Sequence, residues 1–158
     1  MGTLADFVEK WCTPDYPPSP VTKDELDSAQ AKLAVVLPEE YLRAVLQVGL
    51  PSATIALLNS IVENDMNIHD IAEFFTPEEM VDRTVTWKTM GLPEQMTAFA
   101  SDGMGNLFVF VHADEHDGAI GICDHDNAEV KILATSFDAW IAMYESVPSI
   151  SLEDALRD

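Results

Sequence analysis

The hydrophobic pattern is clearest between residues 97 and 141, where three apolar runs alternate with segments rich in Asp, Asn and Gly. Each run has the length of a strand, and the links between runs are too short for helical crossovers. The pattern therefore predicts an antiparallel meander. Its strands are Leu107–Val111, Ala119–Cys123 and Val130–Ala134. The first strand is apolar at every position, so we expect helices to cover both of its faces.

The links around this meander carry local signals of their own. Residues 101–106 read Ser-Asp-Gly-Met-Gly-Asn, and two glycines beside residues that bond their own backbone predict a tight turn. After the last strand, Ser136 is expected to cap a closing helix. That helix turns an apolar stripe toward the sheet, made of Phe137, Trp140, Ile141 and Tyr144.

Upstream of the meander, one helix start is especially well marked. Thr22 and Glu25 have the spacing of a capping box, with Val21 and Leu26 as the hydrophobic staple around it. The helix that follows is predicted to bury one apolar face. That face contains Leu26, Ala29, Leu33 and either Val36 or Leu37.

Three further helices follow from similar signals. Pro38 is expected at the first position of a helix that ends at Gly49. Residues 76–79, Thr-Pro-Glu-Glu, predict the start of another. Near the N-terminus, Leu4 to Trp11 has an amphipathic pattern and is expected to dock on the domain.

The domain organisation predicted from these elements is simple. The length of 158 residues indicates one domain. We expect an arm at residues 1–21, a folded domain at 22–147 and an acidic tail at 148–158. Residues 55–62 are apolar enough for either a strand or a buried helix. The predicted fold class is α+β, a single domain in which an antiparallel meander sheet packs with helices.

Net charge is the feature of composition that most restricts function. The chain has 8 Lys and Arg against 28 Asp and Glu, a formal net charge of −20. Nucleic acids and anionic membranes are therefore poor partners. The first residues lack the basic and then apolar order of a signal peptide, so we expect a cytoplasmic protein. In that compartment the widely separated Cys12 and Cys123 are expected to be reduced thiols.

The negative charge is concentrated in the links of the meander, since no Lys or Arg lies between Lys88 and Lys131. We expect several of these carboxylates to share one end or edge of the sheet and to attract a basic protein partner. The residues predicted to contact that partner are Asp102, Asp114, Glu115, Asp117, Asp124 and Asp126. The alternative is that the acidic surface serves only solubility.

Candidate catalytic and metal-binding chemistry is weak in this sequence. His112, His116 and His125 lie among aspartates, and zinc accepts such donors, but neither HExxH nor Cys-xx-Cys spacing is present. Ser101 lacks a nucleophile-elbow motif, and acidic neighbours disfavour the thiolate of Cys123. Residues 102–106 lack the alternating acids of an EF-hand. We therefore expect no metal, no cofactor and no enzymatic activity.

Four short motifs, in this order, resemble the SMI1/KNR4 family of the SUKH superfamily. They are Leu-Pro-Glu-Glu-Tyr at 37–41, Ala-Ser-Asp-Gly-Met-Gly-Asn at 100–106, Asp-His-Asp at 124–126 and Ser-Phe at 136–137. The family's usual Asn-Gly-Gly turn is replaced here by Val-Gly-Leu-Pro at 48–51. The resemblance spans about residues 22–147 and implies the α+β fold of that superfamily.

The function implied by the resemblance is binding. Bacterial members of the superfamily are widely immunity proteins, which neutralise a cognate toxin domain by direct contact, and a basic nuclease domain would suit the charge of this chain. Fungal members resemble regulatory scaffolds, which is the first alternative. The second alternative is a small metal-dependent hydrolase built on the His and Asp cluster.

Overall fold

A computed structural model describes residues 3–52, 55–113 and 115–148 of the chain. These residues form six helices and one five-stranded sheet. The helices are α1 (Leu4–Trp11), α2 (Lys23–Leu33), α3 (Glu39–Val48), α4 (Ile55–Glu63), α5 (Pro77–Lys88) and α6 (Phe137–Glu145). The strands are β1 (Glu73–Phe74), β2 (Met96–Ser101), β3 (Leu107–Val111), β4 (Ile120–Cys123) and β5 (Val130–Ala134).

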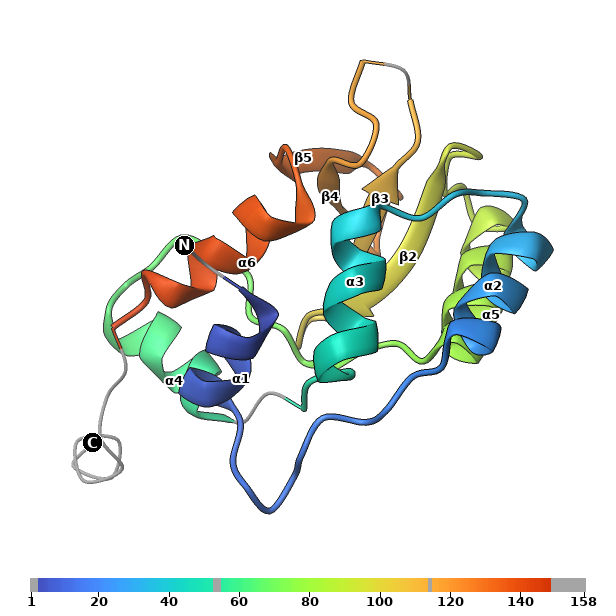
Figure 1. The fold of residues 1–158 in the computed structure, drawn as a ribbon. Coiled ribbons are helices and arrows are strands. Elements are labelled where there is room, and N and C mark those ends of the chain that lie inside the picture. Colours follow the sequence, from blue (N-terminus) through green and yellow to red (C-terminus); the bar gives the residue numbers. More distant parts are fainter. Residues whose placement is uncertain (1–2, 53–54, 114, 149–158) are drawn as a thin grey trace.

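The sheet is an antiparallel meander with the strand order β1-β2-β3-β4-β5 (Figure 1). Each strand pairs with the next one along the chain, which is the arrangement that the short polar links favour. The predicted α+β class is confirmed. All five side chains of β3 are buried, in agreement with its unbroken apolar pattern.

The core lies between the sheet and the helices α1, α3 and α6, which gather on one side of it in Figure 1. Aromatic rings fill this layer. Phe99 of β2 stacks on Phe110 of β3 with ring centroids 4.0 Å apart, and Tyr41 of α3 meets Phe110 edge-on at 4.9 Å. The ring centroid of Trp140 on α6 lies 4.9 Å from that of Phe108. Such offset and edge contacts add to the stabilisation that apolar burial provides.

Helix α5 covers the part of β2 that the two-residue β1 does not reach. There the backbone N–H of Ala98 donates to Oγ1 of Thr84 at 2.9 Å, so a buried side chain takes the place of a neighbouring strand. Helix α2 packs in turn on α5, and the two lie side by side in Figure 1. This pair forms a layer apart from α1, α3 and α6.

The helix starts predicted at Thr22, Thr76 and Ser136 are confirmed. Both capping boxes are present, from Thr22 to Glu25 and from Thr76 to Glu79, and Ser136 caps α6 through the N–H of Ala139. The four residues predicted for the stripe of α6 are all buried. Two details differ from expectation. Pro38 is the N-cap of α3, and α2 ends before Val36, whose side chain points to solvent while Leu37 is buried.

Two strands and one helix were not settled by the sequence. Strand β2 was not among the predicted strands, because Thr97, Ala98 and Ala100 are small residues without a clear period of two. Strand β1 is too short to leave a pattern. Residues 55–63 form a helix, α4, which resolves the choice between strand and helix. Within the described residues, none of the helices combines the length and apolar character needed to cross a bilayer.

Candidate functional site

The acidic residues predicted to bind a partner lie at two opposite ends of the sheet. Successive links of an antiparallel meander alternate between its ends. The β2–β3 turn and the β4–β5 loop therefore share one end, with Asp102, Asp124 and Asp126. The β3–β4 loop lies at the other end, with Glu115 and Asp117. Three of the six residues therefore share one end of the sheet, and the set as a whole is divided between the two ends. Asp114 lies outside the described residues.

At the first end, Asp102 is buried inside its own turn, with its side chain 1% exposed. Its Oδ1 accepts the backbone N–H groups of Met104 and Asn106, both at 2.9 Å, and its Oδ2 accepts Nδ2 of Asn106 at 3.0 Å. Charged acceptors make stronger hydrogen bonds than neutral ones, so this carboxylate fixes the turn. Asp102 is therefore excluded from the surface that a partner could contact.

The network continues from this turn into two histidines. Nδ1 of His69 lies 3.2 Å from Oδ2 of Asp102, and Nδ1 of His125 lies 2.7 Å from Oδ1 of Asn106. The hydroxyl of Tyr144 donates to the carbonyl of His69 at 2.7 Å, which holds the loop before β1 in place. The β2–β3 turn, the β4–β5 loop and residue 69 are thus joined by side chains.

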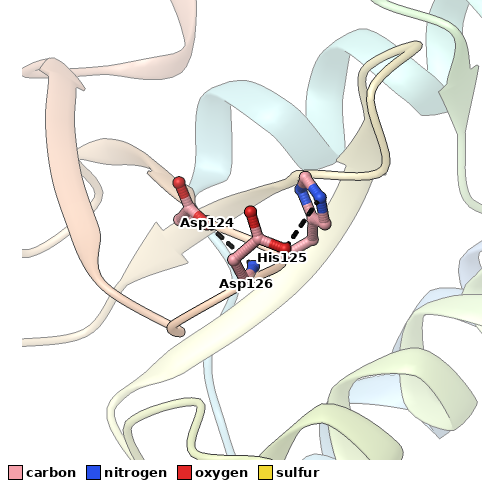
Figure 2. Close-up of side chains that lie close together, drawn as sticks. All are labelled: Asp124, His125 and Asp126. Atoms are coloured by element: carbon pink, nitrogen blue, oxygen red, sulfur yellow. Dashed lines mark hydrogen bonds and ion pairs between the residues drawn. The ribbon is translucent and has the colours of Figure 1, made fainter.

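The β4–β5 loop carries a small cluster of possible metal ligands, Asp124, His125 and Asp126 (Figure 2). One donor atom from each lies within 4.8 Å of the others. Oδ1 of Asp124 accepts the N–H of Asp126 at 2.8 Å, which is an Asx turn, and Nε2 of His125 lies 3.2 Å from Oδ1 of Asp126. His112 and His116 lie at the other end of the sheet, so the His and Asp cluster considered for a hydrolase is divided.

The tip of the β2–β3 turn exposes one apolar side chain. Met104 is 71% exposed, while the N–H of the preceding Gly103 donates to Oδ1 of Asp70 at 3.1 Å. Gly105 has a φ of +89°, a conformation that L side chains rarely adopt. Beside the turn, a cleft of about 280 Å³ has Asp124 and Glu129 among its lining residues.

At the other end of the sheet, a larger groove separates residues 34–39 from the β3–β4 loop. Its volume is about 650 Å³. We call it the α2–α3 groove, and its lining residues are Ala34, Val35, Val36, Leu37, Pro38, Glu39, Leu42, His112, Asp117 and Gly118. Most of these side chains are apolar. The groove therefore combines an apolar floor with acidic residues from α3 and from the loop.

His112 forms the polar side of this groove. Its Nε2 lies 2.8 Å from the hydroxyl of Thr97 on the adjacent strand. Partial burial lowers the pKa of His112 below its ordinary value, against the opposing effect of Asp117. The imidazole is consequently neutral at pH 7, and the groove gains no positive charge from it.

The family model for SMI1 / KNR4 (SUKH-1) matches residues 20–143 of the chain. The protein belongs to the SMI1/KNR4 family. The match includes both ends of the sheet and the α2–α3 groove, whereas α1 precedes it. A comparison with curated protein sequences finds no match to this chain.

The SMI1/KNR4 chain offers little support for covalent catalysis at the residues considered from the sequence. Cys123 is buried, and burial, with a smaller effect of Asp124, raises the pKa of its thiol. Ser101 is the last residue of β2 and pairs with Glu73 and Leu107 in the sheet. Cys123 and Ser101 therefore both have structural roles in this fold.

Several residues that build the two ends were missed by sequence reasoning. His69 and Asp70 lie between residues 62 and 76, where the sequence predicted no element, and Asn106 was noted only as a turn residue. The groove residues Val36 and His112 come from separate links, 76 positions apart in the printed sequence. The resemblance to the SMI1/KNR4 family did place motifs at residues 37–41 and 100–106, beside both sites.

Proposed function

We propose that this protein is a non-enzymatic binding protein of the immunity type, which neutralises the basic effector domain of a bacterial toxin by direct contact. Membership of the SMI1/KNR4 family supports this proposal, because such a role is the one that the resemblance implies for bacterial members. The strongly negative chain favours a basic partner and disfavours nucleic acid.

The observation that carries the proposal is the distribution of charge over the surface. Several Lys and Arg side chains form ion pairs or hydrogen bonds with neighbouring groups. Examples are the pairs Lys23–Asp27, Arg43–Glu39 and Lys88–Glu94, and the bond from Lys10 Nζ to the carbonyl of Glu145. The exposed carboxylates of Glu115, Asp117 and Asp126 lie in a stretch, residues 89–130, that has neither Lys nor Arg. Lys131 follows this stretch and lines the cleft beside Asp124 and Glu129. The loops thus present an excess of negative charge.

The β2–β3 turn also supports binding over catalysis. Asp102 and Asn106 are buried, and their polar atoms are used in hydrogen bonds to the turn and to each other. A carboxylate used in this way makes a loop rigid, and rigid loops lose less conformational entropy when a partner binds. We therefore assign the buried network a structural role, which holds the β2–β3 turn in place and leaves Asp102 and Asn106 without free polar atoms for catalysis.

The test is a pair of charge reversals measured against the protein encoded beside this chain's gene. One double variant is Glu115→Lys with Asp117→Lys, and the other is Asp126→Lys with Glu129→Lys. All four residues are exposed, and the two variants change net charge equally. Asp124 is left intact because it holds the β4–β5 loop. Each variant is therefore the matched control for the other.

Association rates are measured by stopped flow at low and at physiological salt. Reversal at the contacting end should lower the rate by about tenfold or more and flatten its dependence on salt. If wild type binds and both variants keep its rate and salt dependence, attraction by the acidic loops is refuted. If wild type does not bind the protein encoded by the neighbouring gene and binds a signalling enzyme instead, the scaffold function replaces the immunity function.

A further inference from the structure

We infer that the α2–α3 groove, at the β3–β4 end of the sheet, receives an apolar side chain from a basic protein partner. The inference rests on the proposed function and adds to it the contact surface and the chemistry of the partner. The expected occupant is an aliphatic or aromatic side chain flanked by Lys or Arg. Its support comes from the groove's lining, its rigidity and its charge.

The lining has the composition of an interface centre. Val36 is 82% exposed and is the most exposed large hydrophobic side chain in the described part of the chain. It lies in a groove of about 650 Å³ together with Val35, Pro38 and Leu42. Apolar side chains clustered in a concave surface with a polar rim are typical of the residues that dominate binding energy.

Val36 is held outward by an ordered link. Ala34 adopts the left-handed conformation with φ of 56°, which is uncommon for a residue other than glycine. The backbone N–H of Val35 donates to the carbonyl of Gln30 at 3.1 Å, and that of Leu37 donates to Oε1 of Gln30 at 2.8 Å. The exposed valine is therefore presented by a hydrogen-bonded turn, which fits a preformed contact surface.

The charge beside the groove indicates a basic occupant. Asp117 lines it, and Glu115 lies two positions earlier in the same loop, where residues 112–118 include neither Lys nor Arg. On the opposite wall, Glu39 is paired with Arg43 at 3.0 Å, so its charge is partly compensated. Lys88 lies close enough to His112 to lower its pKa, but it is paired with Glu94. The carboxylates of Glu115 and Asp117 would therefore attract cations that flank an inserted apolar side chain.

A second exposed apolar side chain beside an acidic loop is Met104, at the opposite end of the sheet. It stands at the tip of a turn, whereas Val36, although also exposed, borders the α2–α3 groove and is one of its lining residues. Beneath it, Asp102 and Asn106 already use their polar atoms within the molecule. We therefore place the partner's anchor in the groove and use Met104 as a comparison.

The experiment replaces exposed apolar residues by Asp and measures affinity for the partner identified by the charge-reversal test. Val36→Asp should weaken binding by at least about tenfold, because it puts a charge where the apolar anchor inserts. Met104→Asp and Val85→Asp are matched controls, since both residues are exposed and lie outside the groove, and each should change the dissociation constant less than about twofold. A larger effect of Met104→Asp than of Val36→Asp overturns the inference.

The outcomes separate this inference from the proposed function. If wild type binds the partner and all three variants bind it equally well, the groove is not the contact surface, and the proposed function is unaffected. If wild type does not bind the partner, the groove is tested with two peptides of defined sequence. A leucine flanked on each side by two lysines should shift the backbone amide resonances of the groove residues 34–37, 39, 112, 117 and 118 more than the same peptide with serine. Equal shifts from both peptides would refute the inference that the groove binds an apolar side chain.

A second copy of the chain is the competing occupant. Sedimentation of wild type and Val36→Asp, compared at the same concentrations, tests it. We expect both to sediment as the same species. Dissociation of a wild-type dimer by Val36→Asp, with no effect on the partner, would show that the groove joins copies of this chain and would overturn the inference.

Discussion

The carboxylate of Asp102 and the side-chain amide of Asn106 lie 3.0 Å apart inside a five-residue turn, and neither side chain is left on the surface. Together they connect His69, on the loop before β1, with His125, on the loop after β4. One buried pair thus fixes the relative positions of three segments. The stability of the fold should depend on it.

We expect Asp102→Ala to lower the free energy of unfolding by about 2 to 4 kcal/mol, because it leaves several buried donors without an acceptor. Urea titration measures the change. Asp126→Ala is the matched control, since this aspartate is exposed in the neighbouring loop, and it should change stability by less than about 0.5 kcal/mol. Similar losses of unfolding free energy in the two variants would contradict the stabilising role of the Asp102 network.

The two glycines of the turn should respond differently to alanine. Gly105 has a φ of +89°, and an added Cβ would meet nothing closer than His125 Cγ at 4.0 Å, so its cost reports the backbone conformation. We expect Gly105→Ala to cost about 1 to 2 kcal/mol. At Gly103 an added Cβ would lie 3.0 Å from Oδ2 of Asp70, a side-chain end that can move, so Gly103→Ala should cost less. Equal unfolding midpoints for the two variants would refute this assignment.

Two buried tyrosines offer a test of hydrogen-bond satisfaction. Among the described residues, the hydroxyl of Tyr41 has no hydrogen-bond partner, although the ring is packed against phenylalanines. Tyr41→Phe should therefore leave stability unchanged or raise it by about 1 kcal/mol. The hydroxyl of Tyr144 donates to His69, so Tyr144→Phe should cost about 1 kcal/mol. A stability loss from Tyr41→Phe as large as that from Tyr144→Phe would contradict the prediction.

Stability should decline in mildly acidic solution because of His112. Burial lowers its folded pKa below the ordinary value of 6.5, so the unfolded chain binds this proton first as pH falls. The resulting loss begins near pH 6.5, continues down to the folded pKa and cannot exceed about 1.4 kcal/mol per pH unit for one proton.

The measurement compares unfolding free energies between pH 7.5 and pH 5.5, a range that includes the onset of the loss near pH 6.5. His112→Gln should show a flatter pH dependence than wild type, because the titrating group is gone. His116→Gln, in the exposed part of the same loop, should retain the wild-type slope. The same slope for His112→Gln and wild type would show that His112 does not contribute.

Elements that depend on neighbouring residues were predictable from the sequence. The capping boxes at Thr22 and Thr76 and the stripe of α6 need only residues within one or two turns of helix. Strand β2 was missed because its small residues are buried by pairing with β3 and by Thr84 of α5, which lies 14 positions from Ala98. Such long-range contacts leave no local pattern.

The candidate sites were harder to predict for the same reason. An aspartate in a polar turn looks exposed, yet Asp102 is buried by a histidine 33 positions away and by the fold of its own turn. Alternation of the meander links also separates acidic residues that are close in sequence, so Asp117 and Asp124 lie at opposite ends. Charge density was readable from composition, but its division between two ends required the topology.

The pairing of the first helix with the last has a consequence for synthesis on the ribosome. The indole N–H of Trp11 donates to the carbonyl of Tyr144 at 3.1 Å, and Nζ of Lys10 donates to the carbonyl of Glu145, so α1 closes on an element that is synthesised 133 positions later. Until α6 has emerged, the nascent chain exposes the part of β2 and β3 that Trp140 covers in the folded protein, at Phe99 and Phe108. A chain released before Phe137 would keep that surface uncovered and become a substrate for chaperones and proteases.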